Sequence, residues 1–178
     1  MIINILYFLL PAAIANIGAS VSSKIFPYWK YPMDFNYTFR GHRVLGDHKT
    51  IRGFICGTLT GFIVYLIQIQ LYTSVPPLKN ISLIDYSATP IYFGMLLSAG
   101  ALIGDALKSF FKRQTNIPSG KSWIPFDQTD WVIGSLLLTS VIIPYTPLFI
   151  LLAMFIGLCS HFIVKVIGYL LKIEKAPI

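Results

Sequence analysis

Charged residues are scarce in this 178-residue chain, at 12% of the sequence, whereas soluble domains carry about a quarter. Hydrophobic residues make up 55%, and the mean hydropathy is +0.69. This combination excludes an ordinary soluble domain. Because about 20 apolar helical residues cross a hydrocarbon core of about 30 Å, the long uncharged runs predict membrane spans. The remaining length leaves no room for a separate soluble catalytic domain.

Cysteine and acidic residues are also few. The two cysteines, Cys56 and Cys159, lie inside apolar runs without CxxC spacing, so we expect small buried hydrophobic residues rather than metal ligands. Seven Asp and Glu residues oppose 14 Lys and Arg residues, which gives a formal net charge of +7. In a membrane protein the basic residues gather on the cytoplasmic side, so we expect no nucleic-acid partner.

Five apolar runs predict an all-α, multi-pass integral membrane protein with five transmembrane helices. The predicted spans cover residues of about 2–21, 53–72, 87–112, 126–143 and 148–171. They form a single membrane domain, 1–178, with two long polar loops, 22–52 and 113–125. Thirteen of the 14 basic residues lie in or beside these loops or at the C-terminal end, and Lys79 is the exception. The positive-inside rule therefore places the N-terminus outside, and both loops and the C-terminus in the cytoplasm.

Acidic residues concentrate in or beside the two polar loops, as Asp34, Asp47, Asp105, Asp127 and Asp130. If its helix continues past Asp105, the residues at positions i+4 and i+7, Ser109 and Lys112, lie on the same face. The i, i+3 spacing of Asp127 and Asp130 lets both carboxylates point the same way, although it is equally typical of helix capping.

The short loop between these two helices brings their ends together, so we expect the carboxylates of Asp105, Asp127 and Asp130 to converge. Three oxygen ligands without a Cys or His cluster suit a hard cation. Mg²⁺ bound partly through phosphate oxygens is the commonest biological case. The three carboxylates are therefore the candidate metal ligands.

Basic residues beside these carboxylates predict a phosphate site. In the segment 46–53 the glycines allow close backbone approach, and a helix N-terminus offers N–H groups to an anion. It is not a P-loop, because Asp47 and His48 interrupt the required Gly-Lys-Thr order. The candidate phosphate ligands are Gly46, Lys49, Thr50, Arg52, Gly53, Ser109, Lys112, Arg113 and Lys121.

Two segments resemble a known enzyme family. The run 104–113 (GDALKSFFKR), followed by Gly120 and 127–130 (DQTD), is similar to the C-terminal part of the CDP-diacylglycerol synthase pattern. The run 43–53 (RVLGDHKTIRG) resembles the loop of its short archaeal branch, CDP-archaeol synthase. The chain departs from the bacterial and eukaryotic pattern at Gln128, where those enzymes have Arg, and it lacks their glycine-histidine-rich run.

The resemblance implies a Mg²⁺-dependent enzyme of the cell membrane with its active site on the cytoplasmic side. Such an enzyme transfers CMP from CTP to the lipid phosphate 2,3-di-O-geranylgeranylglyceryl phosphate and releases pyrophosphate, in archaeal phospholipid biosynthesis. By position, Asp105, Asp127 and Asp130 would bind the metal and, together with Lys112, act as catalytic residues. Lys112 and Arg113 match the Lys-Arg pair of the family. The oligomeric state stays open between a monomer and a homodimer.

The alternative function is a small transporter or channel for an anionic substrate, but it would place ionisable residues near the bilayer midplane. The pattern of CDP-alcohol phosphotransferases needs a glycine after its Asp-x-x-Asp pair, whereas Trp131 follows Asp130 here. A purely structural role leaves the carboxylates unexplained. Polar residues of the first span, Asn16, Ser20, Ser22 and Ser23, either join helices or line the lipid or nucleotide pocket. No role is predicted for Asp34, Asp47 or the histidines, His42, His48 and His161.

Overall fold

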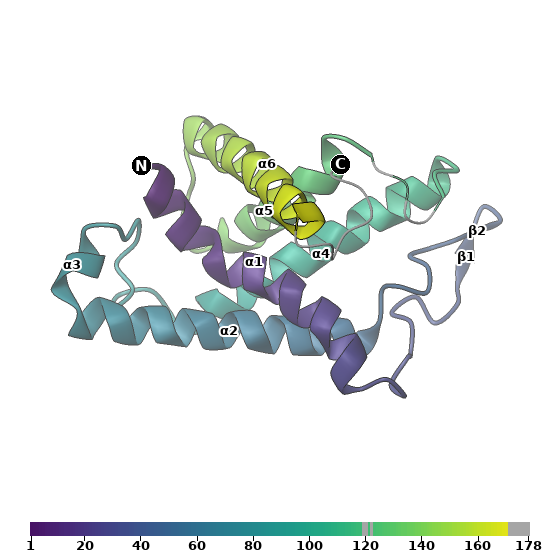
Figure 1. Cartoon of the computed structure of the whole chain (residues 1–178), viewed down its shortest axis with the longest axis horizontal. Coiled ribbons are helices and arrows are strands. Elements are labelled where there is room, and N and C mark those ends of the chain that lie inside the picture. Colours follow the sequence, from purple (N-terminus) through teal and green to yellow (C-terminus); the bar gives the residue numbers. More distant parts are fainter. Residues whose placement is uncertain (119–120, 122, 171–178) are drawn as a thin grey trace.

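The computed structural model describes residues 1–118, 121 and 123–170. Gly120 and residues 171–178, which include the last residue of the predicted fifth span and the chain after it, lie outside these residues. Helices dominate the described chain, with one pair of very short strands between the first two long helices (Figure 1). In chain order the elements are α1 (Ile2–Ile25), β1 (Thr38–Phe39), β2 (His42–Arg43), α2 (Ile51–Ser74), α3 (Pro76–Lys79), α4 (Phe93–Gln114), α5 (Phe126–Thr139) and α6 (Pro147–Leu170).

Among the described residues, three helices are long and apolar enough to cross a membrane, namely α1, α2 and α4. The 14 residues of α5 extend about 21 Å at about 1.5 Å per residue, less than a hydrocarbon core of about 30 Å. In α6 the apolar stretch covers Pro147–Ile163. The chain is thus a mostly helical protein with membrane-spanning helices, and the five-span topology stays a prediction.

Local hydrogen bonds move several helix ends away from the predicted boundaries. α4 begins at Phe93 instead of residue 87, because the Asp85 carboxylate accepts hydrogen bonds from the N–H groups of Ser87 and Ala88, and this makes a turn. α5 ends at Thr139 instead of residue 143. The carbonyl of Thr139 accepts hydrogen bonds from the N–H groups of Ile142 and Ile143, which makes a turn directly after the helix.

The first polar loop contains structure that an all-α prediction leaves out. Strands β1 and β2 pair antiparallel, with Thr38 opposite Arg43 and Phe39 opposite His42. The Phe39 ring lies 6.1 Å from the ring of Phe110 near the end of α4. The hairpin therefore rests on α4, at the right-hand end of the molecule in Figure 1.

The long helices pack in two pairs, α1 against α2 and α4 against α5, and α2 and α4 also meet. Their shared core includes Phe8 of α1, Tyr65 of α2, Phe93 and Leu97 of α4 and Val132 of α5, all buried. The two cysteines are partly exposed, which corrects the expectation that they are buried.

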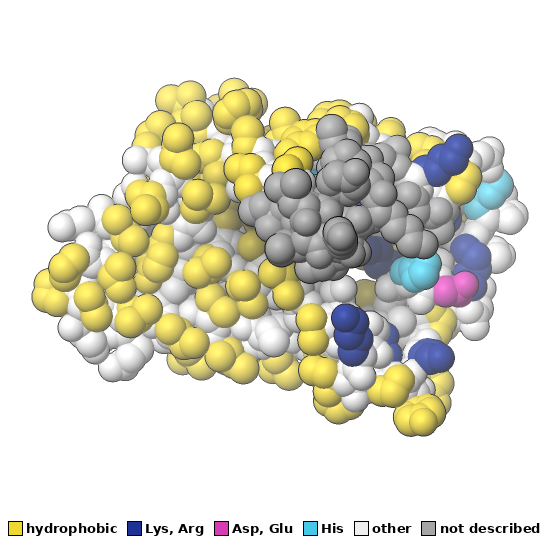
Figure 2. Space-filling view, in the orientation of Figure 1, with side chains coloured by type: hydrophobic (Ala, Val, Ile, Leu, Met, Phe, Trp, Pro, Cys, Tyr) yellow, Lys and Arg dark blue, Asp and Glu magenta, His cyan; other side chains and the backbone are white. Residues whose placement is uncertain are grey.

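Apolar and charged side chains occupy different ends of the surface. Figure 2 shows hydrophobic side chains over much of the visible face, while the visible charged side chains gather at the end that carries the hairpin. Exposed apolar residues recur along the helices, for example Ile17, Ile63, Ile67 and Phe155. This distribution fits helices surrounded by lipid, with the polar loops at one end of the bundle.

Candidate active site

Glycines let α4 and α5 approach closely enough to bring acidic residues together. A Cβ atom on Gly104 would lie 2.1 Å from the carbonyl oxygen of Asp130, and one on Gly134 would lie 2.2 Å from the carbonyl oxygen of Gly100. Any larger residue would push the two backbones apart. The contact at Gly104 places Asp130 beside the turn of α4 that carries Asp105.

Three carboxylates, one from α4 and two from α5, meet at the ammonium group of Lys108. Lys108 Nζ lies 2.9 Å from Asp105 Oδ1, 3.2 Å from Asp127 Oδ1 and 2.7 Å from Asp130 Oδ2. The three carboxylates selected from the sequence thus come together. Their common partner is a lysine that sequence reasoning missed, although its i, i+3 spacing from Asp105 is a signal for contact on one helix face.

Two further lysines flank this carboxylate cluster. Lys49, from the first polar loop, forms an ion pair with Asp105. Lys112 Nζ lies 3.1 and 3.0 Å from the two carboxylate oxygens of Asp127, and it also donates to the carbonyl of Lys121. Three acidic and three basic side chains therefore balance. The balance is needed because partly buried charges without partners are strongly destabilising.

The oxygen donors of the carboxylate cluster fit a hard cation only if Lys108 moves away from them. As the side chains stand, no group of three or more His, Cys, Asp or Glu residues in the described chain is arranged to hold a metal ion, and Lys108 Nζ lies between the carboxylates. Asp130 Oδ2 is buried, and its ion-pair partner, Lys108 Nζ, lies 2.7 Å away. Carboxylate oxygens are the ligands that Mg²⁺ prefers, so the residues fit this ion once Lys108 has moved.

Asp34 fixes the loop that carries Lys49. Its side chain is fully inaccessible to solvent and accepts hydrogen bonds from Arg43 Nε at 3.2 Å and Nη2 at 2.9 Å. Three backbone N–H groups also donate to it, those of Asn36, Leu45 and Gly46. Burial raises the pKa of the Asp34 carboxyl, but the hydrogen bonds from Arg43 and the backbone outweigh it and hold that pKa well below its usual range.

Several predicted phosphate ligands have structural partners. The N–H of Gly46 donates to Asp34 and is therefore already used, while a φ of +91° explains the glycine. Thr50 is the N-cap of α2, and its Oγ1 accepts the N–H of Gly53 at 3.1 Å. Lys49 is different, because its ammonium reaches the carboxylate cluster.

The remaining predicted ligands lie around the cluster at different depths. Arg52 is 6% exposed and donates to the carbonyl of Phe26, while its Nε is buried without a hydrogen bond. Ser109 Oγ donates to the carbonyl of Asp105. Arg113 donates to the carbonyl of Ile117, and its Nε is also buried without a partner. Lys121 is exposed and contributes its backbone carbonyl to Lys112.

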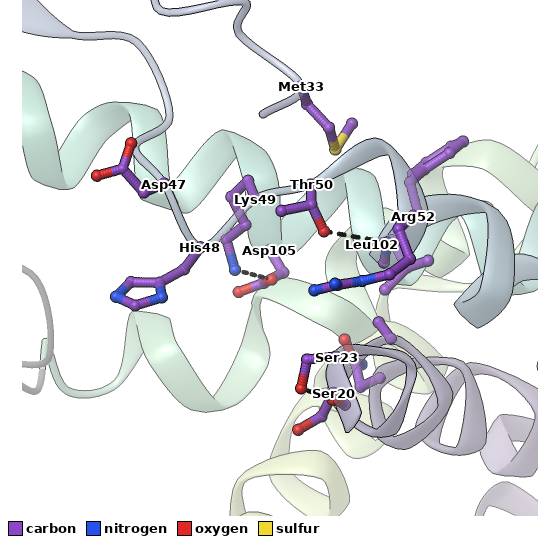
Figure 3. Close-up of a pocket in the computed structure, with 14 residues that line it drawn as sticks. Ser20, Ser23, Met33, Asp47, His48, Lys49, Thr50, Arg52, Leu102 and Asp105 are labelled. Atoms are coloured by element: carbon purple, nitrogen blue, oxygen red, sulfur yellow. Dashed lines mark hydrogen bonds and ion pairs between the residues drawn. The ribbon is translucent and has the colours of Figure 1, made fainter. Parts of the chain in front are cut away.

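A cavity of about 370 Å³, the polar cavity, lies between α1, the first polar loop and the start of α2. Figure 3 shows Arg52 extending into it, with Ser20 and Ser23 of α1 on one side and the Lys49–Asp105 pair beyond. Asn16 lines it as well. Three of the four polar residues of the first span thus line a cavity, whereas Ser22 is buried and donates to the carbonyl of Ala19 in its own helix.

Two more cavities meet at Lys108. The basic cavity, about 350 Å³, is lined by Lys108 together with Arg43, Lys49, Lys112 and Arg113 among others. The apolar cavity, about 460 Å³, has the three carboxylates and Lys108 on one side. Its apolar lining includes Leu6, Leu9, Leu10, Ala13 and Ile17 of α1.

A family model described as CarS-like, CDP-archaeol synthase, matches residues 1–178. The chain belongs to the CDP-archaeol synthase family. This membership confirms the resemblance seen in the two sequence segments. A CDP-archaeol synthase of Methanospirillum hungatei is 35% identical, and the alignment covers 95% of this chain and 99% of that protein. One of Pyrobaculum islandicum is 33% identical, over 98% and 99%.

A solved structure shares the fold of this chain. It is described as an intramembrane enzyme for archaeal membrane lipids biosynthesis, and it superposes with a TM-score of 0.72. The two chains are 25% identical, and the match covers 90% of this chain and 92% of that one. The helical arrangement is therefore shared along nearly the whole of both chains.

Proposed function

We propose that the chain transfers CMP from CTP to 2,3-di-O-geranylgeranylglyceryl phosphate, forming CDP-archaeol and pyrophosphate. Membership in the CDP-archaeol synthase family supports this activity. At the level of residues, one observation carries it: the carboxylate cluster and Lys108 lie where a basic cavity meets an apolar cavity. An enzyme that joins a nucleotide to a lipid needs its reactive groups at such a junction.

The reaction needs alignment more than acid–base chemistry. An oxygen of the lipid phosphate attacks the α-phosphorus of CTP, and the new P–O bond forms as the bond to the β-phosphate breaks. Pyrophosphate leaves with that electron pair. The attacking group is already an anion at neutral pH, so no general base is required. Catalysis then depends on holding two anionic reactants together and on neutralising their charge.

Each cavity suits one part of the substrates. Lys49, Lys112 and Arg113 would bind the phosphates of CTP in the basic cavity. The apolar cavity, lined by α1, would hold the start of the lipid chains and direct the lipid phosphate to the cluster. The polar cavity, with Asn16 and the unpaired Nε of Arg52, would hold the nucleoside.

Asp105, Asp127 and Asp130 would hold Mg²⁺ in the active enzyme. When bound there, the ion supplies positive charge beside the phosphates and lowers the cost of bringing two anions together. The convergence of these three carboxylates, which supply the oxygen donors that Mg²⁺ prefers, supports this part of the proposal.

The proposed membrane placement follows the charge distribution. Five helices would span the cell membrane, with the N-terminus outside and both polar loops, the active site and the C-terminus on the cytoplasmic side. The site takes Lys49 from the first polar loop and Lys112 from the last turn of α4, next to the second polar loop, which supports this orientation. Every group of the proposed site comes from one chain, so the mechanism does not require a homodimer. Transport of an anion is less well supported, since the ionisable groups that the structure describes do not follow a path through the bundle.

The test is pyrophosphate release by purified protein in detergent, with CTP, Mg²⁺ and the ether-linked lipid phosphate, and with the CDP-lipid identified by mass spectrometry. Phosphatidic acid, ATP and EDTA serve as comparisons. We expect release that depends on CTP, metal and lipid, and its loss in Asp127→Asn while the variant elutes and unfolds like the wild type. Folded protein without release would contradict the activity, and an active Asp127→Asn would contradict the site.

A further inference from the structure

Lys108 has an unusual position among the charged residues of the site. Lys49 pairs with Asp105 and Lys112 pairs with Asp127, whereas Lys108 Nζ contacts all three carboxylates. Its side chain is 14% exposed. The ammonium therefore occupies the centre of the cluster, where a bound cation would also have to lie.

An ammonium ion and a divalent cation exclude each other at this position. The Nζ–oxygen distances of 2.7 to 3.2 Å are ordinary for an ion pair. Mg²⁺ needs oxygen ligands at about 2.0–2.1 Å, so the carboxylates would have to close on the volume that Nζ now fills. Two positive charges at one point would also repel each other strongly in a partly buried site.

A second location for the ammonium lies close by. Lys108 lines both the basic cavity and the apolar cavity, and its four-carbon stem has freely rotating bonds. In the basic cavity it would join Lys49, Lys112 and Arg113, where a further cation is favourable only when phosphate is present. Nucleotide in that cavity would therefore stabilise the displaced lysine.

We propose that Lys108 is a tethered cation, which holds the three carboxylates in the free protein and yields its place to a divalent cation when the nucleotide binds. The displaced ammonium then binds phosphate oxygens in the basic cavity. This inference rests on the proposed function. It makes the affinities for metal and nucleotide depend on each other, since each ligand favours the same position of Lys108.

The experiment measures Mn²⁺ binding without nucleotide, by the electron paramagnetic resonance signal of the free ion, in wild type, Lys108→Met and Lys108→Gln. Methionine keeps an unbranched side chain, one atom shorter than that of lysine, without the charge. Glutamine keeps a hydrogen-bond donor for the carboxylates, in case the first variant does not fold. Lys79→Met is the matched control, because Lys79 lies over the ring of Tyr72, away from the carboxylate cluster.

Both Lys108 variants should bind Mn²⁺ roughly ten- to a hundredfold more tightly than wild type, because an internal competitor with a unit charge has been removed. Lys79→Met should bind like wild type. The kcat of both Lys108 variants with CTP and lipid should fall, since the phosphates lose a cation. Folded Lys108 variants with unchanged or weaker Mn²⁺ binding would overturn the inference and leave Lys108 a purely structural partner. CDP-lipid formation by wild type in the same preparation separates this failure from a failure of the proposed function.

Discussion

Lys49 and Asp105 form an ion pair that joins the first polar loop to the middle of α4, across 56 residues of sequence. The loop end of this pair is held in place by Asp34, and the helix end is held by the contact of Gly104 with Asp130. Both partners of the ion pair are therefore held in place, Lys49 by its loop and Asp105 by its helix. This arrangement places it beside the cluster before any substrate binds.

Replacing Lys49 by Met should reduce kcat/KM for CTP by roughly tenfold or more, since one cation of the basic cavity is lost. Steady-state rates of pyrophosphate release at varied CTP measure the effect. Lys24→Met removes an exposed charge at the end of α1, in none of the three cavities, and should leave kcat/KM within about twofold. Equal losses in the two variants would argue against a specific role of Lys49.

Asp34→Asn should lower the melting temperature at neutral pH, because the amide cannot replace a buried carboxylate that accepts from Arg43 and three backbone N–H groups. The native pKa of Asp34 lies below its unfolded value of about 4, so its stabilising effect is present above pH of about 4. It is lost as the pH falls further, toward the native pKa. The difference between wild type and variant should therefore shrink in that window, as thermal unfolding in detergent measures.

Asp47→Asn is the matched control for Asp34. Asp47 pairs with the same Arg43 at 2.9 Å, but its side chain is 83% exposed. Exposed ion pairs contribute little, so the melting temperature should hardly change. A pH-independent difference for Asp34→Asn, or an equal loss in both variants, would show that the buried carboxylate is not what fixes the loop.

Gly104→Ala should destabilise the protein by about 1–3 kcal/mol, because the new methyl group meets a backbone carbonyl that cannot move aside. Separating α4 from α5 should also reduce turnover, since Asp105 and Asp130 then move apart. Gly53→Ala is the comparison for stability, because its Cβ would lie 3.2 Å from the Thr50 hydroxyl, a much milder contact. Thermal unfolding of both variants measures the difference, and equal values would contradict the close-approach argument.

Ala13→Phe should raise KM for the lipid phosphate and leave KM for CTP unchanged. Ala13 lines the apolar cavity, but it lines neither the polar cavity nor the basic cavity. A phenylalanine would fill part of a volume of about 460 Å³. Ile3→Phe changes an exposed residue on the same helix and should alter neither KM. An effect of Ala13→Phe on CTP alone would exclude the apolar cavity as the lipid site.

Hydropathy and short motifs in the sequence are enough to predict the long helices, one pair of site residues and the family of this protein. The runs that become α1 and α2 are recognisable as helices because twenty or more apolar residues in sequence need no distant partner to form one. Asp127 and Asp130 are recognisable as a pair because helix geometry alone puts positions i and i+3 together. Family membership also follows from sequence, through the segments that surround Asp105 and Lys49.

Helix ends are harder to predict from the sequence, because single side chains determine where a helix begins or ends. The Asp85 carboxylate holds residues 87 and 88 in a turn, so that α4 begins only after this turn. The hydroxyl of Thr50 caps the N-terminus of α2. Both residue types are common in loops and caps. Whether such a side chain makes a turn or caps a helix depends on which backbone N–H groups nearby have no other hydrogen-bond partner.

Only the tertiary structure decides the chemistry at the centre of the site. Hydropathy did not indicate that Lys108 would meet three carboxylates, or that Asp34 would use the N–H of Gly46 that had been assigned to phosphate. The contacts of Lys108 with Asp127 and Asp130, and of Asp34 with Gly46, join residues at least 12 positions apart in the chain within about 3 Å. They depend on the close packing of α4 against α5, and on a loop folded over a buried carboxylate. Charge pairing across such distances is a property of packing, which local sequence patterns do not contain.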